Sequence, residues 1–353
     1  MAATVTEDVW SASNTTPDAI DEALRRILHE RHAENEALAP ARVLNLVVVV
    51  DRDWKGEISN RLSQVGRYTA SRTILCAVEE GRTKLDAWAA MSYEEVGTGT
   101  EVMHESVEID LGPSHLKGIE TIIDPVVVSE LPIILWSPHG HDDVVDALIG
   151  MIDVMLVDSD DVLEPREALA RALELLQSAY VVDLAWLRTT PWRERLAASF
   201  DPLPRRAMLA HLDRIAIRHR PTSRAAALLL AGWMSSRLHW EPEGFESRDG
   251  KGLIGTARRN GDRVTVDLDA VEQDVQGLSG VSVSCGDRFE LSLDRAPGGL
   301  HARQTLRGDV QEWRVLGASR GEGGILGEGV RQALLRDPTY GPALDAAQTF
   351  CGA

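Results

Sequence analysis

The chain has 353 residues, of which 44% are hydrophobic and 26% charged, and its formal net charge is −18. These proportions are typical of a soluble globular protein with about two domains, and the acidic balance disfavours a nucleic-acid binder, which needs a basic face against phosphate. No apolar run reaches the roughly 18–20 residues of a membrane helix, and the first residues lack the apolar stretch of a signal peptide. We therefore expect a cytoplasmic protein without membrane contact.

Residues 1–16 are small and polar and predict a flexible N-terminus. Thr16-Pro17 has the residue types of a helix start, with threonine before the first turn and proline inside it. The unbroken Val47–Val50 run predicts a strand covered on both faces, as in parallel sheets. Alternating strand-like and helix-like segments continue to Trp240. Residues 17–240 therefore predict an α/β domain with a mostly parallel sheet flanked by helices.

The pattern changes after Trp240. Residues 241–250 form a turn-rich break, and six short strand-like runs follow at 251–259, 262–269, 279–285, 288–295, 299–306 and 310–316. Their connections include Asn260-Gly261 and Gly286-Asp287, which are hairpin turn signals. We expect residues 241–353 to form an antiparallel meander with terminal helices.

Charge is unevenly distributed along the chain. Residues 124–183 hold 13 acids against 2 arginines, whereas residues 184–237 hold 10 arginines against 3 acids. Two interpretations remain open: the blocks neutralise each other in the fold, or the second block forms a basic face for an anionic partner.

Several patterns resemble catalytic or ligand-binding motifs without completing one. His139, His141 and Asp143 lack the further histidine of a metallo-hydrolase box, and the glycine-rich residues 320–329 fit no phosphate-loop spacing, so we expect a mobile loop there. The acidic residues 158–161 follow a predicted strand, where a solvated loop is the common outcome and a functional site the alternative. Cys76, Cys285 and Cys351 form no C-x-x-C pair, and Cys351 is the candidate for redox reactivity. We expect no catalytic residue, no metal and no cofactor.

The segment 183–202, DLAWLRTTPWRERLAASFDP, holds the candidate site. We expect residues 183–188 to complete a buried strand and Thr190-Pro191 to start the next helix. Arginine and tryptophan are over-represented at binding surfaces. The candidates for binding a partner or an anion are Trp186, Arg188, Thr190, Trp192 and Arg193. The alternative is that these arginines pack on the acidic block.

This segment, together with LLLAGWMSSRLHW at 228–240, LPIILW at 131–136 and the C-terminal LLRDPTYGPAL, resembles the glucose-6-phosphate dehydrogenase assembly protein (OpcA) family of cyanobacteria and actinobacteria. The arginine-rich composition suggests an actinobacterial member. The resemblance implies a non-catalytic assembly factor and allosteric activator of glucose-6-phosphate dehydrogenase that supports NADPH production in the oxidative pentose phosphate pathway. The alternative function is an α/β enzyme or sensor that binds a sugar phosphate or a nucleotide such as NADP.

Overall fold

The computed structural model describes residues 6–34, 42–66, 70–95, 101–248, 252–316 and 321–352. The chain forms two compact units. Unit 1 comprises residues 1–157, 178–182 and 322–335, and unit 2 comprises residues 158–177, 183–321 and 336–353. The chain therefore passes between the units several times.

Unit 1 is built on an eight-stranded sheet, sheet A, in the order β1-β4-β5-β3-β2-β6-β7-β8. Its strands are β1 Thr6–Ala12, β2 Leu44–Asp51, β3 Ser71–Val78, β4 Asp86–Glu95, β5 Glu101–Leu111, β6 Ile133–Trp136, β7 Val154–Val157 and β8 Tyr180–Asp183. Its helices are α1 Pro17–Glu34, α2 Lys55–Gly66, α3 Glu120–Ile123, α4 Asp142–Leu148 and α9 Gly321–Gln332. Strands β5, β3, β2, β6 and β7 pair in parallel, whereas β4 is antiparallel to β1 and β5.

The central strand of sheet A explains the apolar run in the sequence. Val47 to Val50 of β2 are fully buried, because β3 and β6 pair on its two sides and helices cover its faces. The order β5-β3-β2-β6-β7-β8 repeats the 3-2-1-4-5-6 order of dinucleotide-binding sheets, with β2 as the first strand. The predicted α/β class is confirmed.

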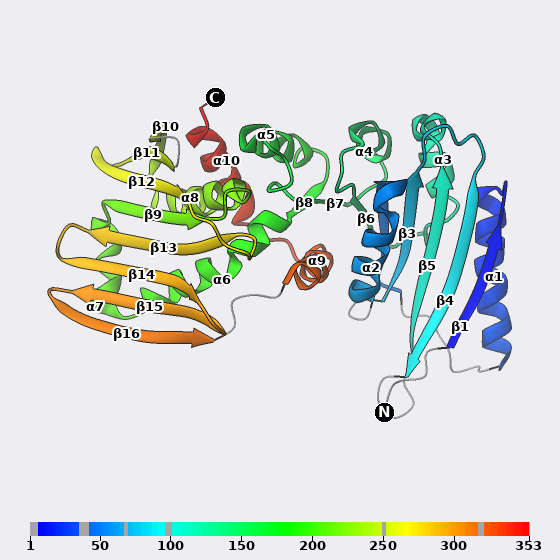
Figure 1. Cartoon of the computed structure of the whole chain (residues 1–353), viewed down its shortest axis with the longest axis horizontal. Coiled ribbons are helices and arrows are strands. Elements are labelled where there is room, and N and C mark those ends of the chain that lie inside the picture. The colour runs from blue at the N-terminus through cyan, green and yellow to red at the C-terminus, as the bar shows by residue number, and fades with distance from the viewer. Residues whose placement is uncertain are drawn as a thin grey trace. The chain divides into compact units, whose positions relative to one another are not determined.

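Unit 2 is built on a second eight-stranded sheet, sheet B, in the order β10-β11-β12-β9-β13-β14-β15-β16. Its strands are β9 Arg214–His219, β10 Glu241–Arg248, β11 Gly252–Arg259, β12 Asp262–Ala270, β13 Leu278–Cys285, β14 Phe289–Ala296, β15 Gly299–Leu306 and β16 Asp309–Leu316. All pairs are antiparallel except β9 with β12. Helices α5 Pro165–Leu175, α6 Leu184–Ser199, α7 Leu203–Arg206, α8 Arg224–Leu238 and α10 Tyr340–Phe350 complete the unit (Figure 1).

Local sequence accounts for much of sheet B. Asn260 and Gly261 both have positive φ, 50° and 90°, as a tight hairpin turn requires, and they join β11 to β12. The six predicted strand runs are confirmed, although residue 251 lies outside the described residues. Behind the sheet, α8 packs closely on α10 at Gly232, where an added Cβ would lie 2.1 Å from the carbonyl oxygen of Ala343. Only glycine permits this approach.

Four expectations need correction. The prediction of a flexible N-terminus is wrong for Thr6–Ala12, which form β1 because they pair along β4. Residues 1–5 lie outside the described residues. Residues 241–248 form β10 rather than a break. The glycine-rich segment forms α9 from Gly321 onward rather than a mobile loop, and residue 320 is not described. Residues 184–188 are helical, as discussed below.

The division of the chain also differs from the one expected. Residue 240 lies inside unit 2, because β9 pairs with β12 and β13 and α8 packs on α10. The segments 184–238 and 241–316 therefore share one core. Within the described residues, no helix is long and apolar enough to cross a membrane.

Candidate functional site

A buried carboxylate begins helix α6. Asp183 is the N-cap residue, and its side chain accepts hydrogen bonds from the backbone N–H of Ala185 (2.9 Å), from the backbone N–H and hydroxyl of Ser159 (3.1 and 2.7 Å), and from the hydroxyl of Tyr340 (3.1 Å). Burial, and next the nearby charge of Asp158, raise the pKa of Asp183 to about 6, although these hydrogen bonds favour its charged form. Asp183 thus joins α6 to two other segments of unit 2.

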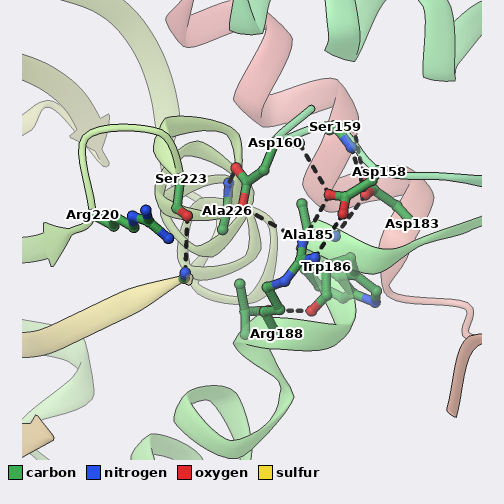
Figure 2. A network of polar contacts seen from close by, with 12 residues as sticks. Asp158, Ser159, Asp160, Asp183, Ala185, Trp186, Arg188, Arg220, Ser223 and Ala226 are labelled. Atoms are coloured by element: carbon green, nitrogen blue, oxygen red, sulfur yellow. Dashed lines mark hydrogen bonds and ion pairs between the residues drawn. The ribbon is translucent and has the colours of Figure 1, made fainter. Parts of the chain in front are cut away.

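One turn further along α6, a buried arginine meets the acidic residues 158–161. The guanidinium of Arg188 donates two hydrogen bonds to the carboxylate of Asp158 (2.7 and 2.6 Å), and its Nη1 lies 3.8 Å from Asp160. Asp160 in turn accepts a hydrogen bond from the backbone N–H of Ala226 (3.1 Å) in the first turn of α8. Figure 2 shows Arg188 and Asp160 between α6 and α8. Burial raises the pKa of Asp160 well above its ordinary value, with Asp158 adding to this and Arg188 opposing it.

A second contact network lies on α6 beside the C-terminal segment. The indole Nε1 of Trp186 donates to Asp337 (2.9 Å), and the guanidinium of Arg193 stacks 3.5 Å from the Trp186 ring. Arg193 also donates to the hydroxyls of Thr189 and Thr190 (both 2.9 Å) and lies 3.6 Å from Asp337. Burial lowers the pKa of Arg193 to about 10. Hydroxyls and one shared carboxylate thus surround a largely desolvated cation.

All five predicted site residues lie on α6, but most are inside the protein. Trp192 is 0% exposed, Trp186 2% and Arg188 7%, and only Thr190 and Arg193 are partly accessible. Burial of Trp186, Arg188 and Trp192 therefore argues against direct contact between these three candidates and a partner. At Arg188 the structure shows the alternative, in which an arginine of the basic block pairs with the acidic block.

The sequence predicts a strand end and a helix start where the structure has one continuous helix. An apolar run does not distinguish a buried strand from a buried helix, and Thr190-Pro191 resembles a helix start. In the structure Asp183 caps the helix and Pro191 lies inside it. Proline costs a helix one backbone hydrogen bond, and the contacts of Arg188 and Arg193 on either side hold the helix in place.

Five residues of these networks were not among the five candidates, although the segment 158–161 was the alternative functional site: Asp158, Asp160, Asp183, Asp337 and Tyr340. Two signals in the sequence pointed to them. The acids at 158–161 follow a strand, and Asp337 and Tyr340 belong to the DPTY segment that carries part of the family resemblance. What the sequence did not provide was their proximity to α6.

The accessible surface next to these networks has a different character. A cavity of about 390 Å³ is lined in part by Asp160, Leu163, Arg220 and Arg224. Leu163 is 97% exposed, and the neighbouring Val162 is 43% exposed. Within the described parts of the chain, neither Arg220 nor Arg224 has an ion-pair partner. Exposed aliphatic side chains beside unpaired arginines are typical of protein interaction sites.

The histidine motif has a structural explanation. His139 stacks on Trp54 with ring centroids 4.6 Å apart, and Nε2 of His141 lies 3.1 Å from the carboxylate of Asp51. Asp142 and Asp143 lie in the first turn of α4, where carboxylates are favoured by the helix dipole. Among the described residues, no group of three or more histidine, cysteine or acidic side chains is placed to hold a metal ion.

The turn after β2 decides how well unit 1 fits a dinucleotide. In dinucleotide-binding sheets a glycine-rich turn after the first strand lets the pyrophosphate approach the backbone at the start of the next helix. Here that turn is a 3₁₀ helix, Arg52–Trp54, which follows Asp51 and leads into α2. It contains no glycine, and Asp53 and Trp54 are exposed on it; the nearest glycine, Gly56, lies in the first turn of α2, where an added Cβ would meet no other atom within 4 Å. This turn does not fit a pyrophosphate.

Comparison with solved structures supports the fold only. The chain resembles KijD10, a 3-ketoreductase from Actinomadura kijaniata crystallised with NADP, with a TM-score of 0.50 and 11% identity over 87% of this chain and 95% of that one. A second structure of KijD10, in complex with TDP-benzene and NADP, matches with the same values. At this identity the likeness concerns architecture and not ligands.

Comparison with protein sequences gives a more specific result. The chain is 31% identical over 244 residues to the putative OxPP cycle protein OpcA of Synechocystis sp., covering 68% of this chain and 51% of that one. The OpcA protein of Nostoc punctiforme is 28% identical over 176 residues, 49% of this chain and 38% of that one. The matches thus span about half or less of the length of these relatives, which are cyanobacterial.

Two models of one family match consecutive parts of the chain. The glucose-6-phosphate dehydrogenase subunit N-terminal domain matches residues 63–174, and the corresponding C-terminal domain matches residues 179–344. The second match contains all of α6 with its five predicted residues, and also Asp337 and Tyr340. Because the two matches together cover well over half of its length, the chain belongs to the OpcA family of glucose-6-phosphate dehydrogenase subunits.

Proposed function

We propose that this protein is a non-catalytic assembly factor and activator of glucose-6-phosphate dehydrogenase, acting in the oxidative pentose phosphate pathway. The observation that carries the proposal is the match of both family domains, whose descriptions name that dehydrogenase. The chemistry of the α6 networks agrees with it. Arg188 and Asp183 are occupied by internal partners, which suits support of a surface better than catalysis.

In this proposal the residues of α6 position the surface and do not themselves touch the partner. Arg188 holds the loop that follows β7, through Asp158 and Asp160, and this loop presents Val162 and Leu163 to solvent. Asp160 also caps α8, whose first turn carries Arg224. The dehydrogenase-binding surface therefore comprises Val162, Leu163, Arg220 and Arg224.

The variant Leu163→Asp is expected to weaken association with the dehydrogenase at least about tenfold, because a central aliphatic contact is replaced by a charge. Calorimetric titration and dehydrogenase activity measured with and without the protein would test this, with size-exclusion chromatography reporting the assembled enzyme. Leu203→Asp is the matched control, since Leu203 is also highly exposed, at 77%, and lies on α7. Equal binding by both variants would refute this surface, and no binding by the unmodified protein would refute the function.

The alternative function, binding of a nucleotide such as NADP, leads to a separate prediction. We expect NADP at millimolar concentration to leave the melting temperature of the protein unchanged, because the turn at Arg52–Trp54 carries no glycine for a pyrophosphate. A ligand present far above its dissociation constant would raise the melting temperature measurably. A reproducible rise that Asp53→Gly increases further would favour the nucleotide-binding alternative.

A further inference from the structure

Unit 1 contains a polar groove that the proposed function does not use. On β1, β4, β5 and β3, side chains that lie opposite one another point to the same face of the sheet. The pairing places Ser11 beside Trp88 and Trp88 beside Glu108 in one row, and Glu7 beside Ser92 and Ser92 beside His104 in another. Side chains of this face line a cavity of about 400 Å³.

Helix α2 forms one wall of the groove. The hydroxyl of Ser59 donates to Glu108 (3.1 Å), and the ammonium of Lys55 lies 2.9 Å from Glu108 and 2.8 Å from Asp110. A second cavity of about 240 Å³ shares Trp88 and Glu108 with the first, so the groove continues along β4 and β5. The volume of the larger cavity, about 400 Å³, lies in the range of small-molecule sites.

The other face of these strands is ordinary core. Ala87, Ala89 and Met91 of β4 and Val107 and Ile109 of β5 are buried, and α1 packs on β4. The groove face has hydroxyl, carboxylate and imidazole groups instead. The exception on the core face is the buried ion pair of Glu105 with Arg72. The row of polar side chains around the Trp88 indole lies on the groove face, where Leu62 and Leu75 also line the cavity.

The groups lining the larger cavity define a class of ligand. Six hydroxyls line it, from Ser59, Ser63, Ser71, Thr73, Ser92 and Ser106. The hydroxyls of Ser59 and Ser63 already donate, to Glu108 and to the backbone carbonyl of Asn60, and can still accept. Those of Thr73, Ser92 and Ser106 can both donate and accept a hydrogen bond, and the carboxylate of Glu108 accepts. The half-buried indole of Trp88 offers an apolar surface for C–H groups. Together these groups match a molecule with several hydroxyls on a compact carbon skeleton.

The same groups disfavour an anion. Among the described residues that line the larger cavity, none is lysine or arginine. Glu105 at its base is 1% exposed and is held by ion pairs with Arg72 (2.6 Å) and Arg42. Lys55, in the smaller cavity, is engaged by two carboxylates. A phosphate or carboxylate ligand would meet negative charge without a free cation to balance it.

We propose that this groove is a binding site for an uncharged polyhydroxylated molecule of mono- or disaccharide size. The site belongs to unit 1 alone and is independent of the dehydrogenase-binding surface on unit 2. Trp88 provides the stacking surface, and Thr73 and Ser106, neighbours on β3 and β5, provide hydroxyls at the centre of the floor. The ligand's phosphorylated form binds more weakly than the ligand itself.

Binding to the full chain is tested with glucose, maltose, sorbitol and glucose 6-phosphate as probes, by saturation-transfer NMR and calorimetry. We expect at least one uncharged probe to bind at millimolar concentration or below and to bind more tightly than glucose 6-phosphate. Trp88→Ala is expected to weaken binding of that probe about tenfold. The variant removes the stacking surface of the indole and its N–H donor, and a stacking contact or a hydrogen bond contributes on this scale. No binding by any uncharged probe, or tighter binding of glucose 6-phosphate, would overturn the proposal.

Two further variants separate loss of the site from loss of the fold. Thr73→Val and Ser106→Val each remove a hydroxyl from the groove floor, and we expect each to weaken the probe several-fold with little change in melting temperature. Ser282→Val is the matched control, because Ser282 is a half-buried strand serine of sheet B in unit 2. Unchanged affinity in both floor variants would contradict the site even if Trp88→Ala failed to fold.

Discussion

Replacing Arg188 with methionine is expected to lower the free energy of unfolding by about 3–5 kcal/mol, the range found when one partner of a buried ion pair is removed. The side chains of Arg188 and Asp158 are 5% and 6% exposed, and Asp160 is fully buried 3.8 Å away. Methionine replaces the apolar part of the arginine side chain and removes the charged guanidinium, which leaves two buried carboxylates without their cation. Urea unfolding measures the difference.

The control for this variant replaces a solvent-exposed arginine of the same protein. Arg303 lies 3.5 Å from Glu312 with both side chains more than half exposed, so Arg303→Met should change stability little. The double variant Arg188→Met with Asp158→Asn should recover part of the loss, because it removes one uncompensated charge. A loss below about 1 kcal/mol for Arg188→Met would show that the network is not a stabilising element of unit 2.

The second large effect concerns pH. Asp183 has a pKa of about 6 in the folded chain against an ordinary value of 3.8, so the folded state binds its proton more tightly than the unfolded state. Its contribution to stability is therefore greatest below about pH 4 and declines as the pH rises to about 6, after which it is level. A shift of about two units corresponds to about 3 kcal/mol. The free energy of unfolding of the Asp183→Asn variant should not show this decline with pH.

The measurement is the difference in unfolding free energy between the unmodified protein and Asp183→Asn, followed from pH 4 to pH 7. The unfolding free energy of the unmodified protein minus that of Asp183→Asn should fall by about 3 kcal/mol over that range. Loss of the hydrogen bonds in the variant adds an amount that does not depend on pH. Tyr340→Phe provides a second check, because the tyrosine hydroxyl donates to Asp183 and lowers its pKa. In that variant the decline should extend to higher pH. Parallel pH profiles for the unmodified protein and Asp183→Asn would refute the assignment.

The buried networks connect α6 to the C-terminal part of unit 2. Trp186 and Arg193 share Asp337, which lies just before α10, and Asp183 accepts from Tyr340 within it. These contacts join α6 to the C-terminal helix, and Gly232 brings α10 against α8. Substitution of any of them affects several helices of unit 2 at once.

The amino-acid sequence by itself determined the local features. Unbroken valines predicted the central strand of sheet A, and Asn260-Gly261 predicted a hairpin, because burial on two faces and positive φ each restrict residue type strongly. It also carried the family resemblance, through residues around Trp186 and Trp192. The charge blocks at 124–183 and 184–237 were visible, but whether they paired was left open.

Only the tertiary structure decided which groups meet. The run at 181–188 suits a buried strand or a buried helix equally, and the hydrogen bonds to Asp183 select the helix from that point. Residues 6–12 lack a hydrophobic pattern because β1 lies at the edge of sheet A, and the pairing with β4 makes the strand. Likewise, the local sequence at 158–161 is compatible with either a solvated loop or a buried ion network. The difference lies in Arg188, about thirty residues further along the chain.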